Sequence, residues 1–143
     1  MTSTPEDHAL LRRAIALAAE ARVDGNPPFG SLLAAPDGTV LAEERNTTLT
    51  DRDITAHPEL KLARWAAREL DAVTAARTTM YTSCEPCPMC ASAIQQAGLR
   101  RVVFALSGEQ LLDIRPGSGR PPVPQDGPAL LAEVRAAVEP YYR

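Results

Sequence analysis

The chain lacks three features that mark large classes of protein. No apolar run is as long as a membrane-spanning helix requires, and the N-terminus has neither the basic nor the apolar region of a secretory signal. Basic residues are not in excess: 15 Lys and Arg stand against 18 Asp and Glu, a formal net charge of −3. We therefore expect a cytoplasmic protein that contacts no membrane and has no large nucleic-acid footprint, which is usually basic.

Cysteine is also scarce, because the chain has only three, all between positions 84 and 90. Such a cluster is not a disulfide framework. In a reducing compartment it more often binds a metal or takes part in chemistry.

The pattern of apolar residues and turn signals predicts one α/β domain that covers residues 1–143. Helices are expected at 5–22, 57–70, 88–97 and 129–138, and strands at 29–35, 39–45, 78–83 and 101–106. The last two strands are joined through a helix, so we expect them to be parallel. The predicted fold is an α/β/α sandwich around a mixed sheet of about five strands.

The C-terminal third is less regular than the rest. Residues 107–128 are expected to form an irregular loop with at most one short edge strand, because eight residues within 115–128 are Pro or Gly. A helix and tail follow at 129–143.

Two short motifs hold the residue types of a metal site. His57 opens the sequence His-Pro-Glu, and Cys87 and Cys90 lie in Pro-Cys-Pro-Met-Cys. One imidazole and two thiolates give three ligands to zinc, which prefers four, so one position stays open to water, as a catalytic zinc needs. Glu59 is then free to move protons. The motifs predict one zinc per chain, held by His57, Cys87 and Cys90 with water or hydroxide as the fourth ligand, and Glu59 as the catalytic residue.

The cysteines have three alternative roles that stay open. Cys84, Cys87 and Cys90 have the spacing of an iron–sulfur run, although cluster sites normally use four cysteines. A structural zinc with Cys84 as the fourth ligand would be a closed site, and it would leave Glu59 without a role. The third alternative is a chance arrangement of buried thiols. The presence of both motifs, each opening a predicted helix, favours the catalytic zinc.

The combined pattern H-x-E and P-C-x-x-C resembles the signature of zinc deaminases that act on nucleobases. On these motifs the chain is similar to the cytidine deaminase superfamily, nearest to its guanine deaminase and tRNA adenosine deaminase branch. The segment at 82–90, TSCEPCPMC, resembles the guanine deaminase form of the second motif, and DITAH at 53–57 resembles the approach D-P-T-A-H. Pro58 departs from the family's H-A-E and removes one backbone N–H beside the substrate.

The resemblance also implies residues that contact the substrate. Phe29 would flank the base, Asn46 would hydrogen-bond it through the side-chain amide, Ala56 and Ser83 would touch the ring through the main chain, and Asp113 and Tyr142 would help the C-terminal segment to close the pocket. The family usually dimerises, and in some members the closing segment comes from the partner subunit. We therefore expect a homodimer.

The reaction that the resemblance implies is hydrolytic deamination of a free nucleobase or nucleoside, by a hydrolase acting on C–N bonds in cyclic amidines. Zinc-bound hydroxide would attack the ring carbon that bears the exocyclic amine, and Glu59 would shuttle protons to the ring nitrogen and the leaving ammonia. A guanine-type ring is favoured, with cytosine or an aminotriazine as other candidates. A tRNA adenosine deaminase is the alternative, disfavoured because Arg135 and Arg143 are balanced by acidic neighbours. An alternative of another class is a non-catalytic, zinc-stabilised binding protein.

Overall fold

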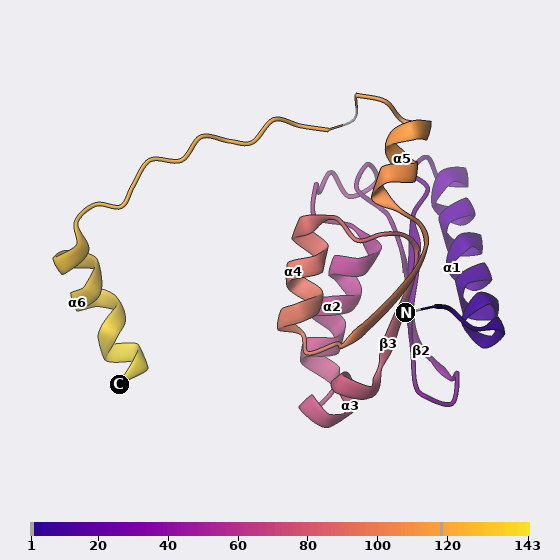
Figure 1. Ribbon diagram of the computed structural model, residues 1–143, viewed down its shortest axis with the longest axis horizontal. Helices are drawn as coiled ribbons and strands as arrows, with labels where there is room; N and C mark the ends of the chain where they lie inside the picture. Colours follow the sequence, from indigo (N-terminus) through magenta and orange to yellow (C-terminus); the bar gives the residue numbers. More distant parts are fainter. Residues whose placement is uncertain (1, 118) are drawn as a thin grey trace.

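The computed structural model describes residues 2–117 and 119–143 (Figure 1). In these residues the helices are α1 (Pro5–Val23), α2 (Pro58–Glu69), α3 (Ala72–Arg77), α4 (Pro88–Gln96), α5 (Gly108–Ile114) and α6 (Leu131–Tyr142), and the strands are β1 (Gly30–Ala34), β2 (Val40–Arg45), β3 (Thr79–Cys84) and β4 (Arg101–Leu106). None of the helices in the described ranges is long and apolar enough to cross a membrane.

The four strands form one mixed sheet in the order β2-β1-β3-β4. β1 is antiparallel to both of its neighbours, whereas β3 and β4 are parallel, which confirms the predicted βαβ unit. The prediction of about five strands is one too many for the described residues. The candidate for a fifth strand lay within 115–128, where prolines lack the N–H that a strand ladder needs.

Helices cover both faces of the sheet, so the predicted α/β/α sandwich is confirmed (Figure 1). Successive residues of a strand point to opposite faces. Leu32 accordingly packs in the cluster under α1, whereas Leu33 packs in the cluster under α2 and α4. The larger cluster, beneath α2 and α4, is the one next to the motif residues.

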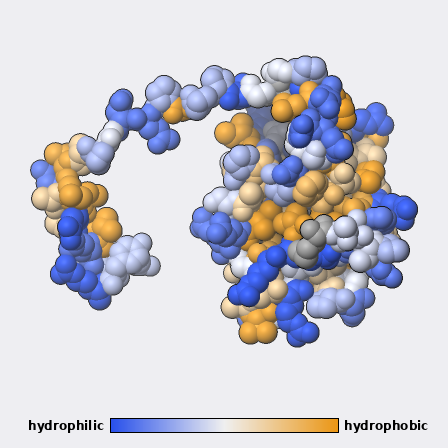
Figure 2. All heavy atoms as spheres, in the orientation of Figure 1, coloured by the Kyte–Doolittle hydropathy of each residue, from blue (hydrophilic) through white to orange (hydrophobic). Residues whose placement is uncertain are grey.

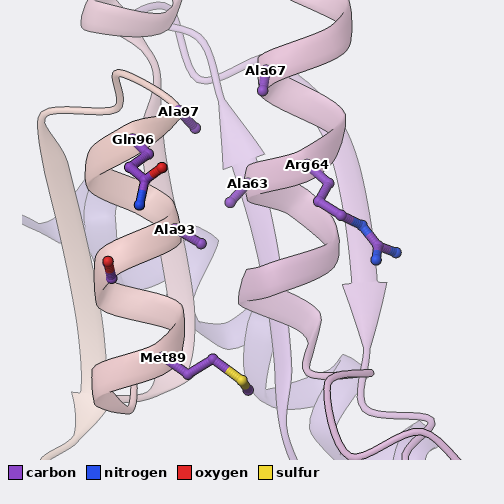
Figure 3. A pocket seen from close by; sticks show the side chains of 8 residues that line it. Ala63, Arg64, Ala67, Met89, Ala93, Gln96 and Ala97 are labelled. Carbon is purple, nitrogen blue, oxygen red and sulfur yellow. The ribbon is translucent and has the colours of Figure 1, made fainter. Parts of the chain in front are cut away.

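The helices α2 and α4 lie side by side and run in the same direction (Figure 3). Small side chains along their contact allow a close approach and leave a shallow groove between them. Figure 3 shows Ala63 and Ala67 of α2 opposite Ala93 of α4 and its C-cap residue Ala97. Parallel alignment brings the two helix N-termini to the same end of the domain. The two predicted metal-binding motifs lie at those N-termini.

Two helices were not predicted. α3 is a short helix capped by Asp71, and α5 occupies the start of the segment expected to be irregular at 107–128. α5 begins with a capping box, in which Ser107 and Gln110 bond each other's backbone N–H, and its Gly108 N–H donates to the Glu85 carboxylate at 2.8 Å. α6 begins and ends later than predicted, at Leu131 and Tyr142, and it stands apart from the rest of the chain (Figure 1).

Candidate metal centre and active site

The three predicted metal ligands come together at the N-termini of α2 and α4. His57 is the N-cap of α2, Cys87 is the N-cap of α4, and Cys90 lies in the first turn of α4. His57 Nδ1 is 3.7 Å from Cys87 Sγ and 3.5 Å from Cys90 Sγ, and all three ligand atoms lie within 4.8 Å of one another. A tetrahedral zinc with bonds of about 2.0–2.3 Å separates neighbouring ligand atoms by roughly 3.5–3.8 Å. The donor set and its spacing therefore fit zinc.

Cys84 is not part of this cluster. Across the described residues, His57, Cys87 and Cys90 are the one group of three or more metal-binding side chains close enough to share an ion. Cys84 ends β3, lines the neighbouring cavity, and has a thiol whose pKa is raised by burial. This geometry favours the three-ligand site over the closed four-ligand site and over an iron–sulfur cluster.

The two ligand thiols form a coupled pair. The pKa of Cys87 is lowered to about 5, first because the Cys90 thiol donates a hydrogen bond to it, and further by the backbone N–H groups of Met89 and Cys90. The same hydrogen bond, together with burial, raises the pKa of Cys90. The start of α4 thus favours a thiolate, which is the form of cysteine that binds a metal.

Glu59 lies beside the ligands without joining them. It occupies the first turn of α2 and is 6% exposed. Burial raises its pKa above the usual value, although the charge of His57 and a hydrogen bond from Ser31 oppose the shift. A carboxylate whose pKa moves toward neutrality is suited to take up and release protons during catalysis.

A cavity of about 680 Å³ opens beside this cluster. Its size is within the range, roughly 300–1,000 Å³, of pockets that enclose small ligands. Of the residues predicted from sequence, Phe29, Asn46, His57, Glu59 and Cys87 line it. Cys90 is fully buried behind the wall.

Asn46 presents one end of its amide to this cavity. It is 3% exposed, and its Oδ1 accepts hydrogen bonds from the backbone N–H and the hydroxyl of Thr48, both at 2.9 Å. The oxygen is already engaged, so the Nδ2 group, which is a donor, is the part of Asn46 left to bond a ligand.

Four predicted substrate contacts do not line the cavity. Ala56 is buried next to His57, and its carbonyl accepts a hydrogen bond from Thr47 N–H at 3.1 Å. The Ser83 hydroxyl accepts from Gly30 N–H at 3.1 Å. Asp113 is exposed on α5, and Tyr142 is 79% exposed at the end of α6. Within this chain the C-terminal helix does not close the pocket.

α5 and the segment after it contribute a wall of the cavity that was not predicted from the sequence. Leu111, Arg115 and Arg120 line the cavity opposite the motif residues. The Ser107–Gln110 capping box marks the start of α5, and Leu111 and Arg115 are four residues apart and so share one face. That signal was present in the sequence but lay inside the segment expected to be irregular.

The domain offers zinc three ligands, one His and two Cys, which leaves the fourth coordination position for water. A buried carboxylate lies beside these ligands. This arrangement is typical of a hydrolytic zinc enzyme. The family described as the cytidine and deoxycytidylate deaminase zinc-binding region matches residues 4–106. The chain belongs to this family of deaminases, which are hydrolases acting on C–N bonds.

Individual relatives include deaminases with different substrates. A probable cytosine deaminase of Schizosaccharomyces pombe is 37% identical over 82% of this chain and 70% of its own length. Guanine deaminase of Bacillus subtilis is 42% identical over 66% of this chain, and a tRNA-specific adenosine deaminase of Haemophilus influenzae is 33% identical over 71%. The chain spans less than two thirds of these last two, 61% and 58%.

The fold is also similar to that of a solved structure. The crystal structure of guanine deaminase from Bacillus subtilis superposes with a TM-score of 0.78 at 30% identity and covers 94% of this chain and 92% of that one. The similarity therefore includes almost the whole chain.

Proposed function

We propose that this protein deaminates a free nucleobase or nucleoside, with a guanine-type ring as the favoured substrate. The observation that carries the proposal is the buried Glu59 carboxylate, which lines the same cavity as His57 and Cys87 without belonging to the metal cluster. The guanine deaminase relatives support the choice of ring. Asn46 fits either a guanine-type or a cytosine-type ring, because its amide donor can reach the ring carbonyl that both carry.

The residues divide the work of the reaction. Zinc, when bound, supplies Lewis-acid activation of water near neutral pH. Glu59 would pass the two protons of the attacking water on, one to the ring nitrogen and one to the departing amine. The water oxygen would bond to the ring carbon as the C–N bond breaks, so that ammonia leaves and the oxygen remains as the carbonyl. Phe29 provides an apolar face for the ring, and Asn46 donates to it from the rim. Pro58, which is fully buried at the first position of α2, offers no N–H to the substrate.

The test is an ammonia-release screen of zinc-loaded protein with guanine, cytosine, adenine, their nucleosides and aminotriazines. We expect guanine or guanosine to give the highest kcat/KM. Glu59→Gln should lower kcat by about 10²–10⁴ while one zinc equivalent stays bound. Glu69→Gln, at the exposed far end of the same helix, is the matched control and should keep full activity.

Each outcome of the screen separates two hypotheses. A clear preference for cytosine or an aminotriazine would refute the guanine-type assignment but leave the deaminase intact. If the zinc-loaded protein released ammonia from none of these rings, or if Glu59→Gln stayed fully active, the proposed mechanism would be wrong. Tight binding of a ring without turnover would favour the non-catalytic binding protein.

One observation favours the tRNA alternative. Arg115 and Arg120 both line the mouth of the cavity, and neither forms an ion pair with any of the described residues. Two cations beside the site are suited to phosphates that flank a target nucleotide. A deamination assay with tRNA at physiological salt tests this: turnover that exceeds the rate on free bases, and that falls in Arg115→Glu and Arg120→Glu, would establish the alternative.

The protein is further proposed to be a cytoplasmic, single-domain homodimer in which α6 of one chain packs on a second copy. Leu131, Val134 and Val138 lie on one face of α6 and are 64%, 49% and 46% exposed. Figure 2 shows apolar side chains on this isolated helix. A helix of 12 residues is marginal by itself in water, so its apolar face needs a partner surface.

Sedimentation equilibrium tests the dimer. The native chain should sediment as a dimer, and Val134→Glu with Val138→Glu should shift it to a monomer. Ala136→Glu, on the opposite side of the same helix, is the control and should leave the dimer intact. A monomeric native chain at about 100 µM would contradict this arrangement.

A further inference from the structure

A buried pair of hydroxyl groups lies directly behind Glu59. Ser31 of β1 and Thr82 of β3 are opposite each other in the sheet and are 0% and 1% exposed. Ser31 Oγ is 3.2 Å from Glu59 Oε1 and 2.7 Å from Thr82 Oγ1. The pair therefore links the centre of the sheet to the candidate catalytic carboxylate.

The direction of these hydrogen bonds follows from counting protons. A serine hydroxyl has one hydrogen to donate, and an ionised carboxylate can only accept. When Glu59 is ionised, Ser31 therefore donates to Glu59 and accepts from the hydroxyl of Thr82. The result is an ordered chain that runs from Thr82 through Ser31 to Glu59.

Polar side chains are unusual on this buried face of the sheet. The next residues on the same face of these strands, Leu33 and Met80, belong to the apolar core beneath α2 and α4. Burying hydroxyl groups is unfavourable unless they are hydrogen-bonded. Among the described residues every fully buried side-chain nitrogen or oxygen has a partner, so the pair is satisfied only through its contact with Glu59 and with itself.

The hydroxyl of Ser31 has a specific consequence for Glu59. Within the described part of the chain, Ser31 is the one side chain that hydrogen-bonds this carboxylate. A glutamate side chain has three rotatable bonds, and fixing it against a rigid strand removes that freedom before the reaction begins. One carboxylate oxygen is held by β1, so the other stays available for proton transfer.

We propose that Ser31 is a positioning residue that holds Glu59 in its reactive orientation, and that Thr82 orients the Ser31 hydroxyl for this task. The proposal rests on the proposed function of Glu59 as the proton carrier. It adds two residues of the sheet core to the machinery of the site, neither of which is a metal ligand.

The main test is Ser31→Ala in zinc-loaded protein. We expect kcat to fall about tenfold, the size of effect of one hydrogen bond to a charged group, with KM changed by less than about twofold because the substrate-binding wall is untouched. Zinc content should stay at one equivalent. Thr82→Val keeps the shape of the side chain and leaves the Ser31 hydroxyl in place, so we expect a smaller loss of about two- to threefold in kcat.

Two further variants separate positioning from simple loss of structure. The double variant Ser31→Thr with Thr82→Ser moves one methyl group across the pair and keeps both hydroxyls and the total volume. It should recover kcat to within about threefold of the native value. In a Glu59→Gln background, Ser31→Ala should cause no further loss of kcat, because a residue that acts through Glu59 has nothing left to position.

Crystal structures of the zinc-loaded variants give a readout that does not depend on turnover. In Ser31→Ala we expect the Glu59 carboxylate to leave its native orientation, and in the swapped double variant to keep it. The proposal is overturned by an unchanged Glu59 orientation or an unchanged kcat in Ser31→Ala, or by a folded swapped variant that fails to recover. If the native protein deaminates no ring at all, the proposed function fails, and the orientation of Glu59 in the crystals alone decides the positioning role.

Discussion

Asp7 is the centre of a buried ion-pair network whose contribution to stability can be predicted. The residue lies in the first turn of α1 and is 4% exposed. Its carboxylate accepts hydrogen bonds from Thr4 N–H at 2.9 Å, from the Tyr81 hydroxyl at 2.7 Å, and from Arg101 at 2.9 and 3.2 Å. One side chain therefore ties the start of α1 to both β3 and β4.

Asp7→Asn keeps the shape of the side chain and removes its charge. Breaking a buried ion pair by removing one partner costs about 3–5 kcal/mol. Water reaches part of the Arg101 side chain, which is 34% exposed, so the expected loss is smaller, about 2–3 kcal/mol. For a domain of this size, that lowers the melting temperature by about 6–9 °C.

The effect should depend on pH in a defined direction. Hydrogen bonds from Arg101, and then from Tyr81, hold the pKa of Asp7 in the folded protein well below its usual range. A carboxyl with a lowered folded pKa contributes its full stability above the unfolded pKa, about 3.9, and loses it as the pH falls toward the folded pKa. The difference in unfolding free energy between the native chain and Asp7→Asn should thus be complete at pH 7 and shrink below about pH 4.

Urea unfolding at pH 7, 5 and 3 measures this difference directly. Glu43→Gln breaks the Arg13–Glu43 pair, whose side chains are 44% and 32% exposed. It serves as the matched control, and it should cost less than about 1 kcal/mol. A loss below about 0.5 kcal/mol for Asp7→Asn at pH 7, or a loss that does not shrink in acid, would refute the reasoning.

Two further predictions concern the metal site and the packing around it. His57→Ala should retain less than about a tenth of a zinc equivalent after dialysis against a weak chelator, as measured by atomic emission. The control Cys84→Ser should keep the full equivalent. A full zinc equivalent in His57→Ala would disprove the ligand assignment. Gly30→Ala should destabilise the fold by about 1–3 kcal/mol in urea unfolding. A Cβ at this position would lie 2.5 Å from Leu17 Cβ and 2.6 Å from the backbone of Ala14. An unchanged urea midpoint of unfolding would contradict the close approach of α1 to β1.

The sequence predicted the motif residues well, because each signal was local. His57, Cys87 and Cys90 are metal-binding residue types that lie at or within one turn of a helix N-terminus. Each of those helices begins with a proline, which marks the helix start in the sequence. The alternation of apolar residues likewise located the four strands to within one or two residues.

The remaining parts depend on contacts between distant segments, which no local pattern records. Ser31 follows Gly30 in a buried strand, and as a sequence it is an ordinary small residue. It acquires a role only because the register places it opposite Thr82 and beneath Glu59, 51 and 28 positions away. In the same way, Arg115 and Arg120 become part of the site because Glu85 holds the start of α5 against the loop between β3 and α4.

At the metal site, the same two residues occupy the N-cap positions of α2 and α4 and serve as candidate metal ligands. An N-cap side chain normally accepts a hydrogen bond from one of the free N–H groups of the first turn. Here the N-cap residues are His57 and Cys87, and neither side chain makes a hydrogen bond of capping geometry, because both are turned toward the metal site. The N–H groups of Met89 and Cys90 act on the Cys87 sulfur only closely enough to help lower its pKa. Pro58 and Pro88 stand at the next position in each helix and remove one free N–H apiece, so each uncapped helix start has one donor fewer to satisfy. Pro58 is in this respect the counterpart of Pro88. Pro58 therefore leaves one unsatisfied N–H fewer at the helix start from which both His57 and Glu59 project.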